Sequence, residues 1–311
     1  MAAITSTPAR LAVFGGILVL VLGAGVGLGA LVGPDETEPT AHDAGGHDGE
    51  QEAGHDAGHD EGGGHAAATP AGLESTAGGY ALHLVDDRLE PGEQRLAFHV
   101  LGPDGAPVTA YDVQHEKELH LIVVRRDLTG FQHVHPTRAA DGTWSVDVDL
   151  TPGVWRVLAD TVPADGAPVV LGTDLAVPGD FEPEPLGEQA LSSSVDGYDV
   201  TLGGLLQSGT ETELALTVTR DGRPVTDLEP YLGAHGHLVA LRSGDLGYLH
   251  VHPDEDGGSG PAIRFHSSFP SAGTYRLFLD FQHGGVVRTA SFTVEVGGTG
   301  ATSEHGAGHE H

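Results

Sequence analysis

Apolar and polar residues alternate in short runs along most of this chain, which is the period of half-buried β-strands. TWSVDVDL (residues 143–150) is a clear example, and Asp104-Gly105 and Asp141-Gly142 are typical of the tight turns between such strands. The pattern predicts two similar sets of seven strands. They lie near 80–85, 93–101, 118–126, 130–135, 143–150, 153–162 and 168–177, and near 196–205, 211–219, 236–242, 246–252, 262–268, 273–281 and 286–296.

The two sets also repeat one another in sequence. Each contains a DG-x-PVT turn (104–109 and 221–226) and, further on, a G-x-[WY]-R-[VL]-x-x-D strand (153–160 and 273–280). One compact unit copied in tandem explains this, and about seven short strands per hundred residues are typical of an Ig-like sandwich. We therefore predict an all-β protein with two tandem Ig-like β-sandwich domains. The first spans 80–180 and the second 188–297, joined by PGDFEPEPLG (178–187).

Ahead of the repeats, residues 11–33 carry no charge and are long enough to form a membrane-spanning helix. Arg10 precedes this segment, while Asp35 and Glu36 follow it. The positive-inside rule then places residues 1–10 in the cytoplasm and the rest of the chain outside a cell membrane that it crosses once. The alternative is a signal peptide that is cleaved to release a secreted protein.

Both ends of the chain are polar and rich in histidine. Residues 34–79 contain no Lys or Arg and include HDAGGHDGEQEAGHDAGHDEGGGH; residues 298–311 resemble them. Neither segment has enough apolar surface to offset its ordering entropy, so we expect both to be disordered. They act either as solvated spacers or as low-affinity metal collectors. The histidines concerned are His42, His47, His55, His59, His65, His305, His309 and His311.

The amino-acid composition limits the partners and the metal ligands that are available to the chain. The chain has 45 acidic and 14 basic residues and a formal net charge of −31, which excludes nucleic acid as a partner and favours cations. It has no Cys and one Met, so thiolate sites and thioether sites for Cu(I) are excluded. Imidazole and carboxylate remain as ligands, and they suit Cu(II), Zn(II) and Ni(II).

One histidine motif occurs in each repeat, in ELHLIVVRRDLTGFQHVHP (118–136) and HGHLVALRSGDLGYLHVHP (235–253). A lone histidine precedes a His-Val-His-Pro by the same spacing in both. Three neutral imidazoles with an open position bind Zn(II) or Cu(II) well. The candidate ligands are His120, His133, His135, His237, His250 and His252, with His115, His235, Asp160, Asp280 and His283 as secondary candidates.

Convergence of each triad depends on strand register. His133 and His135 lie two apart and share a face of their strand. A two-residue loop at Leu128-Thr129 would place His120 on that face, diagonal to His135, whereas a three-residue loop would turn it away. The alternative interpretation is that all six histidines are structural and were duplicated with the domain.

The twin HLxxxxxDLxxxxHVHP-like segments resemble those of bacterial membrane-anchored or secreted proteins with tandem Ig-like extracytoplasmic domains. These proteins are related to YtkA-like and heavy-metal-associated domains. The resemblance covers about 80–297 and implies handling of copper or other heavy metals. Copper carriers of this kind use methionine ligands, which this chain lacks.

Two enzyme families share part of the pattern. His-x-His followed by Pro152-Gly153 resembles cupins, but Arg156 stands where their later histidine would be. FQHVHP resembles the copper strand of Cu/Zn superoxide dismutases, whose cysteines are absent here. We therefore predict no enzyme.

We predict instead a membrane-anchored extracytoplasmic protein that handles or buffers Cu(II), Zn(II) or Ni(II) through one triad per repeat. Its expected partners are metal ions, the cell membrane through residues 11–33, and a metal transporter or other exported protein. The alternative is an Ig-like adhesion or scaffold module on a flexible stalk.

Overall fold

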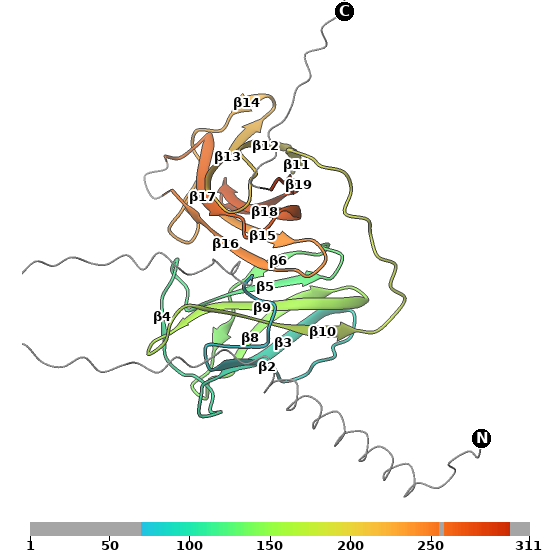
Figure 1. Ribbon diagram of the computed structural model, residues 1–311, viewed down its shortest axis with the longest axis vertical. Helices are drawn as coiled ribbons and strands as arrows, with labels where there is room; N and C mark the ends of the chain where they lie inside the picture. Colours follow the sequence, from blue (N-terminus) through green and yellow to red (C-terminus); the bar gives the residue numbers. More distant parts are fainter. Residues whose placement is uncertain (1–69, 255–257, 299–311) are drawn as a thin grey trace, which may run out of the picture. The chain divides into compact units, whose positions relative to one another are not determined.

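The computed structural model describes residues 70–254 and 258–298, which form two β-sandwiches (Figure 1). The fold class predicted from the sequence is confirmed, since no helix occurs in these two ranges. The described part therefore offers no helix of the length and apolarity needed to cross a bilayer. The predicted anchor at 11–33, its cytoplasmic flank at 1–10, most of the histidine-rich linker and the tail from 299 lie outside the described residues.

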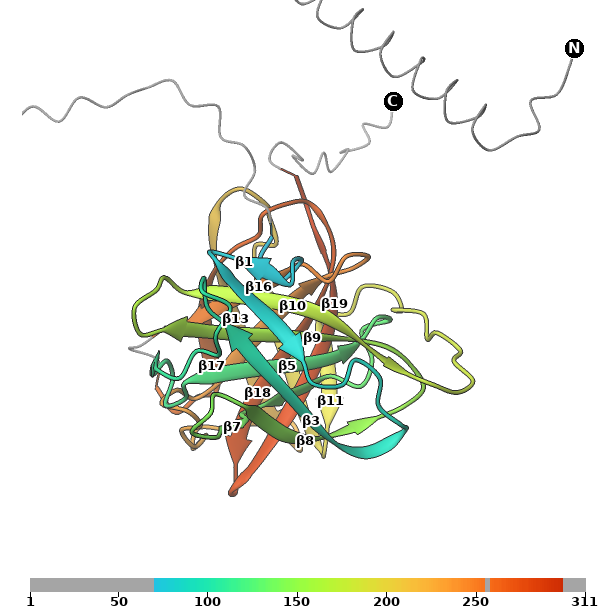
Figure 2. The same cartoon turned by 90° about the horizontal axis from the view of Figure 1, so that it is seen from below.

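The first sandwich contains two sheets, with strand orders β1-β2-β3-β8-β7 and β10-β9-β5-β6, and β4 pairs with β9. Figure 2 shows β3 and β8 of one sheet crossing over β9 and β10 of the other. Large side chains such as Trp144, Trp155 and Phe98 fill the space between them. The strands are β1 (Thr76–Ala77), β2 (Tyr80–Leu84), β3 (Gly92–Leu101), β4 (Tyr111–Asp112), β5 (Leu119–Arg125), β6 (Gln132–Val134), β7 (Thr137–Arg138), β8 (Trp144–Leu150), β9 (Gly153–Pro163) and β10 (Val169–Val177).

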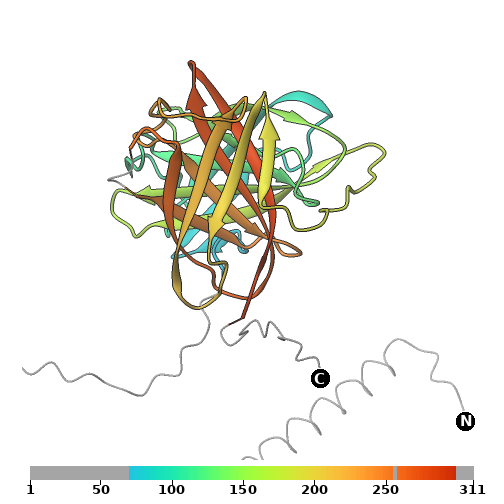
Figure 3. The ribbon, with the colours of Figure 1, turned by 90° about the horizontal axis from the view of Figure 1, so that it is seen from above.

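The second sandwich is one continuous pairing path, β11-β12-β13-β17-β16-β15-β18-β19, with β14 beside β13. Figure 3 shows its outer strands in yellow and orange. Tyr198, Tyr275, Phe265 and Phe292 are buried in its core. The strands are β11 (Ser192–Val195), β12 (Tyr198–Gly204), β13 (Glu211–Arg220), β14 (Arg223–Pro224), β15 (His237–Arg242), β16 (Tyr248–Pro253), β17 (Ala262–Ser268), β18 (Gly273–His283) and β19 (Val286–Val296).

All fourteen strands predicted from alternation are present, with ends displaced by a few residues. The sequence prediction missed β1, β4, β7, β11 and β14, which are short or, in β11, serine-rich and without an alternating pattern.

The predicted extent of the disordered linker, 34–79, is wrong at its end. From Pro70 onwards the chain is part of the first sandwich, and β1 pairs with β2. The guanidinium of Arg156 donates hydrogen bonds to the carbonyls of Gly72 and Leu73, at 2.6 and 2.7 Å. Hydrogen bonds to the backbone of this segment help to hold it in place, so its composition gave no sign of order.

The two sandwiches contact each other through a third apolar cluster, to which β5 contributes Ile122 and Val124 and β15 contributes Val239 and Leu241. The rings of Phe131 and Phe278 stack across the contact, with centroids 3.9 Å apart and planes 5° apart. Because one face of β5 lies in its own core and the other in this cluster, all seven of its residues are buried.

The stacked phenylalanines give a test of this contact. Phe278 is 4% exposed, so Phe278→Ala should lower the free energy of unfolding by about 3–5 kcal/mol, measured by urea denaturation. Phe181→Ala removes the same atoms from a ring that is 42% exposed and should cost about 1 kcal/mol or less. Equal effects of the two substitutions would show that the sandwiches do not pack through this ring.

Candidate metal centre

The hairpin between β5 and β6 determines where the first triad lies. Ile122 is opposite His133 and Leu121 is opposite Val134, so one further step places His120 directly opposite His135. The loop has neither of the two lengths considered above: it has four residues, 126–129, closed by the Arg125 N–H donating to the Thr129 carbonyl at 3.0 Å. The register moves by two positions, which leaves His120 on the predicted face.

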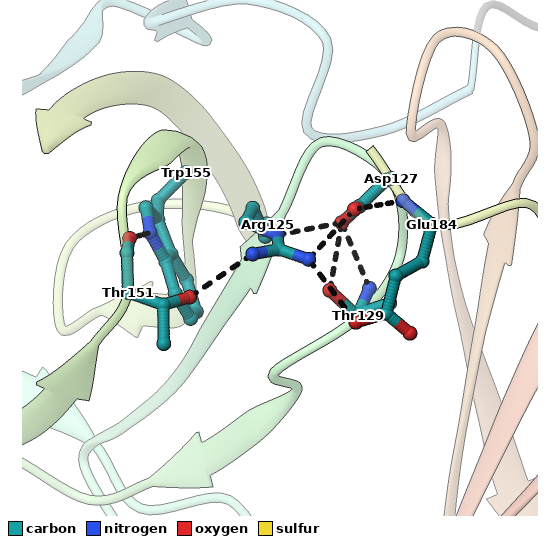
Figure 4. A network of polar contacts seen from close by, with 6 residues as sticks. All are labelled: Arg125, Asp127, Thr129, Thr151, Trp155 and Glu184. Carbon is teal, nitrogen blue, oxygen red and sulfur yellow. Dashed lines mark hydrogen bonds and ion pairs between the residues drawn. The ribbon is translucent and has the colours of Figure 1, made fainter. Parts of the chain in front are cut away.

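Asp127 explains the longer loop (Figure 4). Its carboxylate accepts two hydrogen bonds from the guanidinium of Arg125, at 2.9 and 2.8 Å, one from the Thr129 hydroxyl at 2.8 Å and one from the Glu184 N–H at 2.9 Å. Burial alone would raise the pKa of Asp127, but these hydrogen bonds outweigh burial and lower it to about 2. Leu128 takes a φ of +64° to complete the turn.

The three histidines of the first repeat converge. His120 Nδ1 lies 3.1 Å from His133 Nε2 and 3.2 Å from His135 Nε2. The ligand atoms of all three lie within 4.8 Å of one another. Their ring centroids are 4.9 to 5.4 Å apart, so the rings surround a common point and do not stack. Among the described residues, this is the only group found with a geometry that fits a metal ion.

Hydrogen bonds behind two of the rings determine their tautomers. His120 Nε2 lies 3.0 Å from the Gln114 carbonyl, and His133 Nδ1 lies 2.8 Å from an Asp280 carboxylate oxygen. Carbonyl and carboxylate oxygens only accept, so each of these nitrogens carries the proton. In neutral imidazoles the inner nitrogens, His120 Nδ1 and His133 Nε2, are then unprotonated and face each other with their lone pairs.

Burial favours the neutral form of His120 and of His135. It lowers the pKa of His120 to about 4 against the hydrogen bond to Gln114, which raises it, and the neighbouring His133 lowers it further. The pKa of His135 falls to about 2, again chiefly through burial and then through His133 and His120. Imidazole binds metal in its neutral form, so both rings are in the binding form at neutral pH.

The second repeat copies this backbone arrangement. Leu238 is opposite Val251, which places His237 opposite His252, and Arg242 binds Asp245 in the loop as Arg125 binds Asp127. His237 Nε2 donates to the Tyr231 carbonyl at 2.8 Å, as His120 does to Gln114. Burial lowers the pKa of His237 to about 4, against that hydrogen bond. The side chains of His250 and His252 lie outside the described part, so convergence of the second triad stays a prediction.

The secondary candidates for metal ligands differ in how they lie relative to the three histidines. The ring of His115 lies 6.1 Å from that of His120 and 5.4 Å from that of His237. Asp280 binds His133, and Asp160 accepts a hydrogen bond from the Tyr248 hydroxyl at 2.8 Å.

The remaining candidates stand apart. His283 forms hydrogen bonds with Tyr198 and Asp227, and His235 lines a cleft of about 360 Å³ together with His115. The eight histidines of the two ends lie outside the described residues.

A second cleft, of about 450 Å³, borders the centre at His120. Gln114, His115, His120 and Asp160 are among the residues that line it. His120 lines this cleft although that residue is only 4% exposed, whereas His133 and His135 do not line it.

Sequence reasoning missed the acceptors behind the rings. The carbonyls of Gln114 and Tyr231 have no side-chain signature. The one available signal was positional, because the two lie at the same distance before His120 and His237.

Several solved structures are similar to this chain at low level. A protein of the DUF4426 family from Pseudomonas aeruginosa is 12% identical, with a TM-score of 0.27, over 34% of this chain and 96% of that one. The Escherichia coli adhesin FdeC is 16% identical, with a TM-score of 0.25, over 72% of this chain and 65% of FdeC. A putative membrane-anchored protein from Corynebacterium diphtheriae is 9% identical, with a TM-score of 0.22, over 71% and 59% of the two chains. Scores this low support no conclusion about function.

No curated protein matches the chain. One family model does, and it matches twice, over residues 75–177 and 193–298. These two matches cover most of both sandwiches and more than half of the chain. The chain therefore belongs to the family described as a domain of unknown function, DUF8832, and carries two copies of that domain.

Proposed function

We propose that the protein binds a divalent transition metal ion between His120, His133 and His135. The observation that carries this proposal is the convergence of three imidazoles, with His120 Nδ1 3.1 Å from His133 Nε2 and 3.2 Å from His135 Nε2. In neutral rings with the tautomers given above, lone pairs at these distances repel each other. A cation between them turns the repulsion into attraction, and a metal ion does so for all three rings together.

Two of the nitrogen separations are close to those around a tetrahedral ion. Ligand nitrogens at about 2.0–2.1 Å from zinc would lie about 3.3 Å from each other. The separations from His120 Nδ1 are 3.1 and 3.2 Å, and the ligand atoms of all three rings lie within 4.8 Å of one another. Three protein ligands leave a fourth position open, and imidazole suits Zn(II) and Cu(II).

We extend the proposal to the second repeat on its backbone. His237 has the same tautomer and the same cross-strand position as His120, which supports a second ion held by His237, His250 and His252. The two repeats would then bind one ion each.

For the cellular role we propose buffering or handling of Cu(II), Zn(II) or Ni(II) outside the cytoplasm, without catalysis. The acidic composition and the histidine-rich ends, which raise the local concentration of cations, support this role. Residues 11–33 would hold the chain in the cell membrane, close to a metal transporter or another exported protein. A chain that binds no metal would instead fit an adhesion or scaffold module.

Calorimetric titration tests the metal proposal. We would use the full-length chain with its eight terminal histidines replaced by asparagine, in about 0.5 M salt, which screens diffuse attraction to acidic residues. Zinc or Cu(II) should bind at up to two sites, and the double variant His133→Ala/His135→Ala should lose one. The matched control is His83→Ala/His99→Ala, a cross-strand pair on β2 and β3, which should bind as the parent does. Absence of any site tighter than about 0.1 mM (roughly 5 kcal/mol of binding free energy) in the parent would contradict the proposal.

The neutral histidines also predict how stability depends on pH without metal. His120, His135 and His237 have lowered pKa values in the folded state, whereas in the unfolded chain they titrate near pH 6.5. Below about pH 6.5 the unfolded chain therefore binds protons that the folded chain does not. The free energy of unfolding should fall as the pH drops from about 6.5 towards 4.

Urea denaturation of the metal-free protein at a series of pH values measures this fall. The variant His120→Gln/His135→Gln should show a shallower slope between about pH 6.5 and 5, where carboxylates contribute little. Parallel slopes for the two proteins would contradict the assignment of buried neutral rings.

A further inference from the structure

We infer that the metal centre of the first repeat is completed by the second repeat, in which Asp280 acts as the positioning residue for His133. This inference rests on the proposed function, because it assigns a partner to one of the proposed ligands. Asp280 lies on β18, opposite His237, and its carboxylate reaches across the contact between the sandwiches to His133 Nδ1 at 2.8 Å.

The Asp280–His133 pair is enclosed. Both side chains are 5% exposed, and the second carboxylate oxygen of Asp280 accepts a hydrogen bond from the Thr289 hydroxyl at 2.5 Å. A buried carboxylate is costly unless a positive charge offsets it. A dication on Nε2 of His133, on the far side of the same ring, supplies that charge.

The arrangement matches the way in which carboxylates act behind metal-binding histidines. A carboxylate on one ring nitrogen selects the tautomer, orients the ring and increases the electron density at the other nitrogen. Loss of such a partner lowers metal affinity by about 10- to 100-fold. Here the ligand and its carboxylate belong to different repeats, so the position of one sandwich against the other determines the ligand strength of His133.

Metal binding at the first triad and packing of the two sandwiches against each other are then thermodynamically linked. An ion that prefers the oriented His133 binds more tightly when the sandwiches are in contact, and by the same free energy it stabilises their contact. The two DUF8832 copies would therefore work as a pair, because one copy alone lacks the carboxylate that orients His133.

The chain offers a matched control for this argument. Tyr248 of the second repeat donates a hydrogen bond to Asp160 of the first at 2.8 Å, so it also joins the sandwiches, whereas the hydrogen bonds of His133 go to His120 and Asp280. Phe131 is the residue of the first repeat at the position of Tyr248. Tyr248→Phe removes only the hydroxyl and gives the residue that the first repeat already uses there.

The experiment measures zinc affinity in the full-length chain with the eight terminal histidines replaced. This parent also carries His250→Gln/His252→Gln, so that only the first triad remains. Asp280→Asn keeps the shape of the side chain and removes its charge. It should weaken zinc binding by about 10- to 100-fold, whereas Tyr248→Phe should change it by less than about threefold, under about 1 kcal/mol at 1.4 kcal/mol per tenfold change.

A spectroscopic measurement separates orientation of His133 from general support. With Cu(II) as the probe, Asp280→Asn should change the hyperfine splitting in the electron paramagnetic resonance spectrum, and Tyr248→Phe should leave it unchanged. If Asp280→Asn does not fold, Thr289→Val, which frees one carboxylate oxygen, should weaken zinc binding in the same direction, and unchanged binding would overturn the inference.

The remaining outcomes are distinct. If the parent binds zinc and Asp280→Asn binds it equally well, the inference fails while the proposed function stands. If Tyr248→Phe weakens binding as much as Asp280→Asn, Asp280 only joins the repeats and the inference also fails. A parent that binds no zinc overturns both.

Discussion

Three imidazole nitrogens approach one another closely, with His120 Nδ1 3.1 Å from His133 Nε2 and 3.2 Å from His135 Nε2, and the rest of the proposed site depends on this convergence. The Gln114 carbonyl and the Asp280 carboxylate hold the protons on the outer nitrogens. Burial removes the alternative of protonating His120 near neutral pH, since its pKa is about 4. These properties support the metal site proposed above.

The apolar contact between the sandwiches contributes to the burial of His120. β5 is buried on both faces, by its own core and by the cluster that includes Ile122 and Val239. His120 lies on this strand and is therefore in a low-dielectric environment. The same contact brings Asp280 to His133. The burial of His120, the tautomer of His133 and the proposed ligand strength of His133 thus depend on the contact surface between the sandwiches. Both repeats are needed to form this surface.

Much of this could be predicted from residue patterns alone. Period-two alternation located the long strands, and the repeated His-Val-His-Pro placed His133 and His135 on one face. The loop length could not be predicted, because it depends on how Asp127 collects donors from Arg125, Thr129 and the distant Glu184. Asp280 was expected only as an auxiliary ligand. Its role behind His133 depends on the docking of two repeats, for which local sequence carries no signal.

The most direct test of the account is anomalous diffraction at the zinc absorption edge from crystals of the zinc-loaded protein. The account predicts an anomalous peak between His120 Nδ1, His133 Nε2 and His135 Nε2, about 2.0–2.1 Å from each, with the Asp280 carboxylate still on His133 Nδ1. Peaks confined to surface carboxylates, with an empty space between the three rings, would contradict it.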